Sequence, residues 1–179
     1  MSEKLIVLSG PSGVGIGEIV SALFARGNGL VPVVPVTARK MKEGERNGVG
    51  FFFFELEEWN AMKASGDLLE TTEFAGNDYG TSRRLVEEQF EKGNSVLMER
   101  ELGRAAQIKQ NMPEAICVYV EPSPAVLERR LREISRSELE FSLRLQTAER
   151  LRAQAAFCDR RVCSDEIAAA AAEIESLLA

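Results

Sequence analysis

The stretch LSGPSGVGIGEIVSAL, from Leu8 to Leu23, has the glycine spacing of a loop that binds phosphate. It follows KLIVLSG, an apolar run typical of a strand buried on both faces, and it leads into a helical pattern. Glycines allow a tight turn in which successive N–H groups and a helix N-terminus point at an anion. The stretch therefore predicts a phosphate loop, with an ordinary glycine-rich turn between strand and helix as the alternative.

Two positions of this loop depart from the pattern G-x-x-x-x-G-K-[ST], because Ile16 stands where the lysine belongs and Gly17 where the serine or threonine belongs. The lysine places a positive charge on the phosphates during phosphoryl transfer, and isoleucine cannot do so. Loss of such a donor costs about 3 to 4 kcal/mol of transition-state stabilisation, or roughly 100- to 1000-fold in rate. Glu18 suits the helix dipole but repels an incoming phosphate.

Composition limits the remaining possibilities. A chain of 179 residues with 45% apolar residues predicts one compact domain. The net charge of −6 argues against a protein that coats nucleic acid. With no histidine and no CxxC pair, the usual zinc sites and Ser-His-Asp or Cys-His chemistry are excluded, and the three cysteines are expected to be reduced, packed thiols. Without a signal peptide or membrane span, we expect a cytoplasmic protein that contacts no membrane.

Alternation of strand and helix patterns along the chain predicts an α/β fold. Two regions interrupt this alternation: 35–82, which suggests an inserted lobe, and 132–145, which is either a lid or a solvated helical face. Beyond the first strand and helix, strands are expected at 31–38, 50–55, 95–99 and 115–122, and helices at 55–65, 82–92, 103–110, 123–133, 137–156 and 165–178.

Four segments in order, LIVLSGPSGVG, VTARKMKEGERNGVGFFF, LLETTEFAGNDYGTSRRLVEE and SVLMERELGRAAQI, resemble the guanylate kinase family over nearly the whole chain. The resemblance implies a single domain, 1–179, with the core of P-loop nucleoside monophosphate kinases and a parallel sheet (1–34, 83–131 and 146–179). It also implies a small GMP-binding lobe at 35–82 and a helical lid at 132–145. Family members transfer phosphate from ATP to GMP with Mg²⁺, so ATP and Mg²⁺ are the implied cofactors.

The resemblance also implies roles for individual residues of the GMP lobe. Arg39 and Tyr79 match groups that bind the GMP phosphate. Glu70 matches the carboxylate that accepts hydrogen bonds from guanine N1–H and the exocyclic amine, and Thr81 matches a hydroxyl that helps to read the base. Other positions differ from the family pattern: Lys42 replaces an arginine, Phe51 a tyrosine, Pro35 a serine, Gly50 an aspartate and Glu101 another aspartate.

On the catalytic side, the resemblance points to Glu99, after a buried strand, and to Arg144, on the lid helix. A carboxylate there can order a hydrated Mg²⁺ or contact the base. The lid loop REISRS is one residue shorter than the family's, and Ile134 falls near a lid arginine that Arg132 or Arg136 could replace. The residues expected to contact ATP are those of the loop: Gly10, Ser12, Gly13, Val14, Gly15, Ile16 and Gly17.

Two functions are therefore predicted. The first is a divergent guanylate kinase that binds GMP and has weak or lost catalysis. The second is a catalytically inactive binding module that holds a phosphorylated peptide or a protein partner in the same groove. Retention of the base-reading groups supports a guanine nucleotide ligand, whereas Ile16 opposes efficient turnover.

Overall fold

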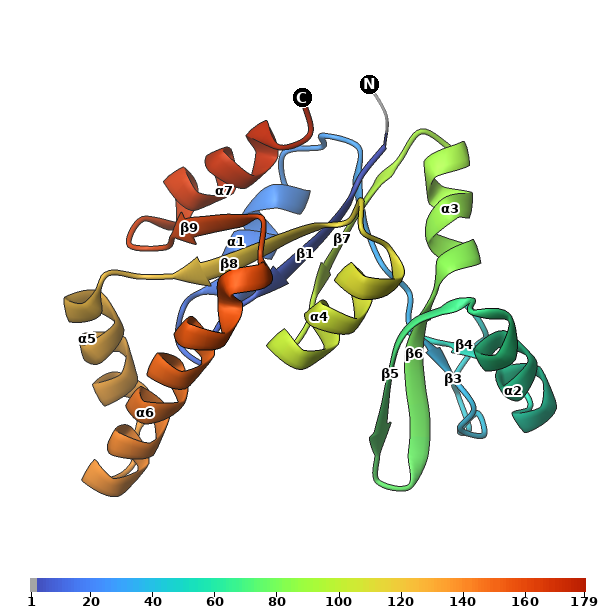
Figure 1. Cartoon of the computed structure of the whole chain (residues 1–179), viewed down its shortest axis with the longest axis horizontal. Helices are drawn as coiled ribbons and strands as arrows, with labels where there is room; N and C mark the ends of the chain where they lie inside the picture. Colours follow the sequence, from blue (N-terminus) through green and yellow to red (C-terminus); the bar gives the residue numbers. More distant parts are fainter. Residues whose placement is uncertain (1–2) are drawn as a thin grey trace.

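A computed structural model describes residues 3–179 and has a parallel sheet at its centre (Figure 1). The sheet consists of β1 (Leu5–Ser9), β2 (Leu30–Pro32), β7 (Ser95–Glu99), β8 (Ile116–Glu121) and β9 (Arg160–Cys163), in the order β2-β7-β1-β8-β9. All neighbouring pairs in it are parallel. The loop that follows β1 therefore lies at the carboxyl edge of the sheet, where α/β proteins commonly bind ligands.

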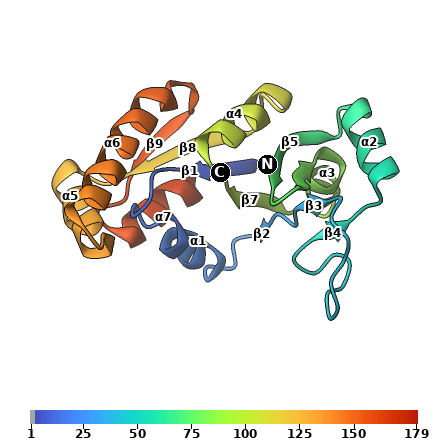
Figure 2. The same cartoon turned by 90° about the horizontal axis from the view of Figure 1, so that it is seen from below.

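Helices cover both faces of this sheet, which explains the continuous apolar run of β1 (Figure 2). Ile6 and Leu8 belong to a core cluster with α1 (Ile16–Phe24) and α7 (Ile167–Ser176). The alternate residues Leu5 and Val7 belong to a second cluster with α3 (Arg83–Glu91) and α4 (Leu102–Asn111). Because successive strand residues point to opposite faces, a strand between two helical layers is apolar at every position.

A second, smaller sheet lies beside the first (Figure 1). It is built from β3 (Val36–Thr37), β4 (Phe52–Phe53), β5 (Leu68–Phe74) and β6 (Asn77–Ser82), in the order β4-β3-β6-β5. Trp59, from α2 (Leu56–Ser65), is buried against its face with Val36 and Leu68. These elements lie within 35–82, the range predicted for the inserted lobe.

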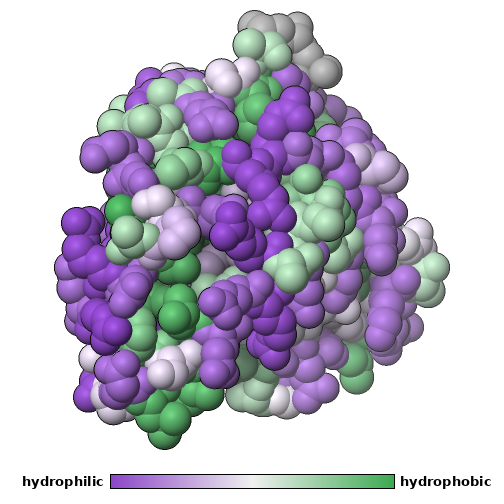
Figure 3. Space-filling view, turned by 60° about the vertical axis from the view of Figure 1, so that its left-hand side comes forward, coloured by the Kyte–Doolittle hydropathy of each residue, from purple (hydrophilic) through white to green (hydrophobic). Residues whose placement is uncertain are grey.

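The helical hairpin of α5 (Pro124–Ile134) and α6 (Glu138–Gln154) extends away from the sheet, and the short helix η1 (Ala155–Phe157) returns the chain to β9 (Figure 1). Residues 132–145 cover the end of α5, the turn and the first half of α6. The side of the molecule that carries this hairpin has hydrophilic and hydrophobic side chains interspersed (Figure 3). Ile134, Leu139 and Leu143 are its exposed large apolar residues.

Several expected elements differ from the structure. The predicted strand 31–38 is two short strands in different sheets: β2 ends at Pro32 and β3 begins directly after Pro35, and neither proline has the N–H that a ladder needs. The predicted strand 50–55 contains only β4. Strands β5, β6 and β9 were not predicted. Within residues 3–179, no helix is long and apolar enough to cross a membrane.

Candidate functional site

The backbone of the loop after β1 has the geometry of a phosphate-binding turn. A Cβ at Gly10 would lie 2.5 Å from the carbonyl oxygen of Val120, so only glycine allows this approach to β8. Gly15 is the N-cap of α1 with φ of 87°, a left-handed conformation that favours glycine. It supplies no side-chain cap, so the first amides of α1 remain available to an anion.

Ile16, at the lysine position, is the first residue of α1, and its side chain is only 5% exposed. It packs in the core cluster with Leu8 and Val14, so apolar contacts replace a charge at this place. The cavity beside the loop, about 470 Å³, is lined by residues 11–18 and by Glu99, Arg130, Glu133, Ile134 and Ile167. Three of its lining side chains are carboxylates, Glu18, Glu99 and Glu133, and one is a cation.

That cation, Arg130, is already bound to the protein. Its Nη1 donates to the carbonyl oxygen of Val14 at 3.2 Å, and its Nη2 donates to the carbonyl oxygens of Ser164 and Asp165 at 2.9 and 3.2 Å. Arg130 therefore holds the loop against the β9–α7 connection. Its charge only partly offsets the three carboxylates around the cavity.

The lid helix contacts the loop through Arg144. Its Nη1 donates to Ser12 Oγ at 2.7 Å, while Nε and Nη2 donate to Glu140 at 3.1 and 2.7 Å. Arg132 is engaged within the hairpin itself: it pairs with Glu128 and Glu138, and its guanidinium lies 4.0 Å from the ring centre of Phe141. Arg144 is thus the predicted lid arginine whose side chain donates to the loop, and its catalytic role stays a prediction.

In the small lobe, Arg39 is paired with Glu45. Its Nη1 and Nη2 donate to the two carboxylate oxygens at 2.9 and 2.8 Å. The hydrogen bonds from Arg39 and from the Lys42 backbone lower the pKa of Glu45 to about 2. A phosphate at Arg39 would have to compete with this carboxylate.

Aromatic rings surround the Arg39 guanidinium. It lies 5.7 Å from the ring centre of Phe51 and 5.1 Å from that of Phe53. The Phe51 and Tyr79 rings are 5.7 Å apart. The predicted phosphate-binding residues Arg39, Phe51 and Tyr79 are therefore brought together, whereas the exposed Lys42 contributes only its backbone N–H to Glu45.

Glu70, the predicted base-reading carboxylate, is the centre of a buried network. Its Oε1 accepts hydrogen bonds from Thr81 Oγ1 at 2.7 Å, Arg100 Nε at 3.1 Å and Arg104 Nη2 at 2.8 Å, and its Oε2 accepts one from Arg104 Nε at 2.6 Å. Arg100 Nη2 also donates to the Thr81 hydroxyl at 3.1 Å. The Glu70 side chain has 0% exposed area. Both predicted base-reading side chains therefore face protein partners.

These contacts control the ionisation of the network. Burial alone would raise the pKa of Glu70, but hydrogen bonds from Arg104 and Thr81 and the charge of Arg100 bring that pKa below its ordinary value. Burial also lowers the pKa of Arg100, and the Glu70 charge opposes this shift. Glu70 is thus a carboxylate held between two guanidinium groups.

A second cavity, about 480 Å³, lies in front of this network and is lined by Pro35, Phe51, Thr72, Glu73, Phe74, Tyr79, Arg100, Glu101 and Arg104. Glu99 lines the cavity at the loop, whereas Arg100 and Glu101 line this one. The last residue of β7 and the two residues after it therefore border the two cavities. Glu70 and Thr81 lie behind the arginines and do not line the cavity.

Sequence reasoning missed Arg100, Arg104 and Glu45 as parts of this site. A weak signal for the arginines was present, since Arg100 directly follows the predicted strand 95–99 and Arg104 lies at the start of the helix after it, at the end of a strand where α/β proteins commonly bind ligands. Glu45 had no comparable signal, because it lies in the turn-rich segment KEGERNGVG.

Comparison with known proteins decides the family. The guanylate kinase family model matches residues 2–179. The chain belongs to the guanylate kinase family. The guanylate kinase of Synechococcus sp. (strain JA-3-3Ab) is 41% identical over 178 residues, covering 98% of this chain and 82% of that protein. The guanylate kinase of Enterococcus faecalis (strain ATCC 700802 / V583) is 36% identical over 185 residues, covering 100% and 90%.

Solved structures agree on the fold. The crystal structure of guanylate kinase from Anaplasma phagocytophilum matches with a TM-score of 0.61 and 24% identity, over 99% of this chain and 85% of that one. Shikimate kinase from Bacteroides thetaiotaomicron matches with a TM-score of 0.53 and 14% identity, over 98% of each chain. The predicted α/β fold with the core of P-loop nucleoside monophosphate kinases is confirmed.

Membership of the guanylate kinase family implies the use of ATP and Mg²⁺, and this loop fits them poorly. Within residues 3–179, no group of three or more acidic or cysteine side chains is placed to hold a metal ion. Phosphates commonly supply most of the Mg²⁺ ligands at nucleotide sites, together with one or two carboxylates. Here Ile16 offers the phosphates no charge, and the three carboxylates repel them.

Proposed function

We propose that this protein binds a purine nucleoside monophosphate in its small lobe and transfers phosphate from ATP to it weakly or not at all. The observation that carries the proposal is Ile16, which is buried in the core at the position of the catalytic lysine. The backbone turn of the loop is retained, and the charge that would stabilise the transferred phosphate is missing.

Contacts in the small lobe support monophosphate binding. Phe51 and Tyr79 line a cavity large enough for a small ligand, and Arg39 packs against the Phe51 ring. The cavity at the loop, in contrast, has more carboxylates than cations, and its one arginine is bound to backbone carbonyls. A triphosphate is therefore expected to bind this protein more weakly than a monophosphate does.

The second candidate is a binding module without catalysis, in which the groove beside Arg39 and Arg104 holds a phosphorylated peptide or a protein partner. The same absence of lysine favours it, together with two arginines, Arg100 and Arg104, that line the cavity. The two candidates differ in one measurable respect, because only the first predicts that a lysine at position 16 restores turnover.

The test is an ADP-release assay with ATP, Mg²⁺ and each of GMP, IMP and XMP as acceptor. We expect near-background release from the wild type and roughly 100-fold more from Ile16→Lys with at least one acceptor. Ile16→Gln is the matched control, because glutamine is a long polar side chain like lysine but carries no charge. Circular dichroism must show that both variants fold, since either polar side chain enters an apolar site.

Rapid turnover by the wild type, at the level of an ordinary guanylate kinase, would refute the loss of catalysis. If Ile16→Lys folds and stays inactive with all three acceptors, the binding module becomes the better account. Calorimetric titration of ATP and of each monophosphate tests the binding asymmetry separately. ATP binding as tight as monophosphate binding would contradict the proposed weakness of the loop.

A further inference from the structure

The network around Glu70 leaves donors, not acceptors, facing the small-lobe cavity. A guanidinium has five N–H groups, and Arg104 uses two of them on Glu70. Arg100 uses one each on Glu70, Thr81 and the Glu99 carbonyl oxygen. Among the described residues, the remaining N–H groups of both arginines have no protein acceptor.

The acceptors that could have read a guanine are blocked. The Glu70 side chain has no exposed area, so a ligand reaches it only after an arginine moves away. Thr81 Oγ1 donates to Glu70 and accepts from Arg100, and the residue is 0% exposed. Moving either arginine breaks charge-assisted hydrogen bonds in a buried place, which is costly because both charges lose their partner.

Guanine fits such a pocket badly at one edge. Its N1–H and its exocyclic amine at C2 are donors, and they would meet the donors of Arg100 and Arg104. A buried donor without an acceptor costs more than a hydrogen bond gains. A purine with an oxygen at C2 also carries N1–H, but at C2 it presents an acceptor that can take a guanidinium N–H, so the difference lies at C2.

We propose that Arg100 and Arg104 are specificity-determining residues. With them in place, the pocket binds a base through hydrogen-bond acceptors of the base and no longer through its donors. The ligand class that fits is a purine nucleoside monophosphate with an oxygen, not an amine, at C2. The inference rests on the proposed binding of a purine monophosphate in the small lobe, and it adds which base is preferred.

Two carboxylates, Glu73 and Glu101, also line this cavity and could accept from a guanine amine. Both residues are exposed. Each carboxylate is solvated already, so a hydrogen bond to it replaces one to water and contributes little. The arginines are largely buried, with side chains 12% and 23% exposed, so the match at their N–H groups decides the preference.

Three monophosphates that differ chiefly at C2 test the proposal: GMP carries an amine there, IMP a hydrogen, and XMP an oxygen together with a hydrogen on N3. Calorimetric dissociation constants are measured for the wild type and for the double variant Arg100→Leu/Arg104→Ala. We expect the wild type to bind XMP most tightly and GMP least, with a difference of about tenfold or more. The double variant frees Glu70, and its order should reverse to favour GMP.

Arg84→Ala is the matched control, because it removes one arginine of α3 that pairs only with Glu88 on the surface. It should keep the wild-type order. Glu101→Gln should also keep it, and a reversal there would assign the preference to Glu101 and refute the role of the arginines. If the double variant does not fold, Arg104→Ala alone replaces it, since Arg100 still pairs with Glu70.

The outcomes separate this inference from the function on which it rests. Equal binding of all three monophosphates, or tighter GMP binding by the wild type, overturns the inference and leaves the proposed monophosphate site intact. An unchanged order in the folded double variant also overturns it. Failure of every purine monophosphate to bind overturns both.

Discussion

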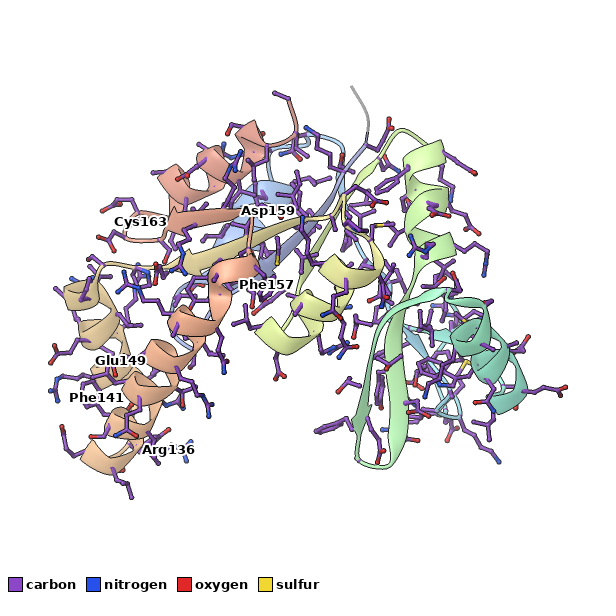
Figure 4. All side chains as sticks on the ribbon, in the orientation of Figure 1. Arg136, Phe141, Glu149, Phe157, Asp159 and Cys163 are labelled. Carbon is purple, nitrogen blue, oxygen red and sulfur yellow. The ribbon has the colours of Figure 1, made fainter. Side chains whose placement is uncertain are left out.

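The thiols of Cys117 and Cys158 are in contact, with their sulfur atoms 3.5 Å apart. Cys117 is a buried residue of β8, and Cys158 directly follows η1. The hydrogen bond between the thiols lowers the pKa of Cys158, which makes it the nucleophile of the pair. Figure 4 shows Phe157 and Asp159, the neighbours of Cys158, where the chain returns from α6 to the sheet. We therefore expect a mild two-electron oxidant to join these two cysteines.

The reaction with diamide, an azo oxidant, proceeds in two steps. The Cys158 thiolate adds to the N=N bond, and the Cys117 thiol then attacks the Cys158 sulfur, releasing the reduced hydrazine. Two electrons and two protons thus pass from the thiols to the oxidant. The sulfur atoms must approach by about 1.5 Å to reach the ordinary disulfide bond length.

The expected stabilisation follows from the length of the closed loop. Cys117 and Cys158 are 41 positions apart, and the loop between them contains the entire α5–α6 hairpin. In the chain-entropy model, closing a loop of this length stabilises the folded state by about 4 kcal/mol. For a chain of this size, that corresponds to an increase in Tm of roughly 10 °C.

The assay compares reduced and diamide-treated protein in a Cys163→Ala background, because the exposed Cys163 could otherwise join two molecules. Peptide mass spectrometry without reductant identifies the bond, and thermal unfolding followed by circular dichroism gives Tm. The Cys117→Ser variant receives the same treatment as the control and should show no shift. If the bond forms and Tm does not rise, the entropic reasoning is wrong. If Cys158 reacts and never pairs with Cys117, the geometric reasoning is wrong.

Three further predictions concern the loop, the buried network and the lid. Gly10→Ala places a Cβ against a carbonyl oxygen of β8 and should lose about 2 kcal/mol in urea unfolding, whereas Gly17→Ala, with no atom within 4 Å, should gain up to about 1 kcal/mol. Because the folded pKa of Glu70 is lowered, its contribution to stability is present above the ordinary carboxyl pKa of 4.5 and is lost as the pH falls below it. Glu70→Gln should therefore cost about 3 kcal/mol at pH 7 and flatten the urea-measured stability profile between pH 5 and 3; an equally steep profile would contradict this. Arg144→Ala should change stability by less than about 1 kcal/mol but speed hydrogen exchange in the first half of α6, because its contact with Ser12 joins the lid to the loop; unchanged exchange would show that the contact does not hold the lid.

The elements that the sequence predicts best are those with one strong local cause. The run KLIVLSG followed by glycines predicted β1, the loop and α1, because a strand covered on both faces is apolar throughout. The hairpin of β5 and β6 was missed because its strands carry many polar residues and its turn lacks the usual Asn-Gly pair. Its turn residues Ala75 and Gly76 both have positive φ, which is unusual for alanine.

The sequence predicted the parts of the candidate site that depend on one residue. It did not predict the parts that depend on contacts between several residues. Ile16 could be interpreted from its position in the loop without any structure. Glu70 was identified, but its state was not, because its partners are 30 and 34 residues away in the sequence. Only the folded chain shows that Arg100 and Arg104 occupy both of its oxygens. The residue type of Glu70 predicted a hydrogen-bond acceptor for the base. In the folded chain, the groups at this place that remain for a ligand are the N–H donors of Arg100 and Arg104.

The two cavities differ in the charges that line them, and this connects the proposed loss of catalysis with the proposed change in base recognition. At the loop, Ile16 and three carboxylates line the cavity in which the phosphates of ATP would bind, so the binding of ATP is disfavoured. In the small lobe, two guanidinium groups cover the one buried carboxylate, so the base that donates hydrogen bonds is disfavoured. The end of β7 supplies Glu99 to the first cavity, and the next residue, Arg100, lines the second. Because each proposed change opposes transfer from ATP to GMP, we expect a lysine at position 16 to restore turnover best toward a base that the arginines accept.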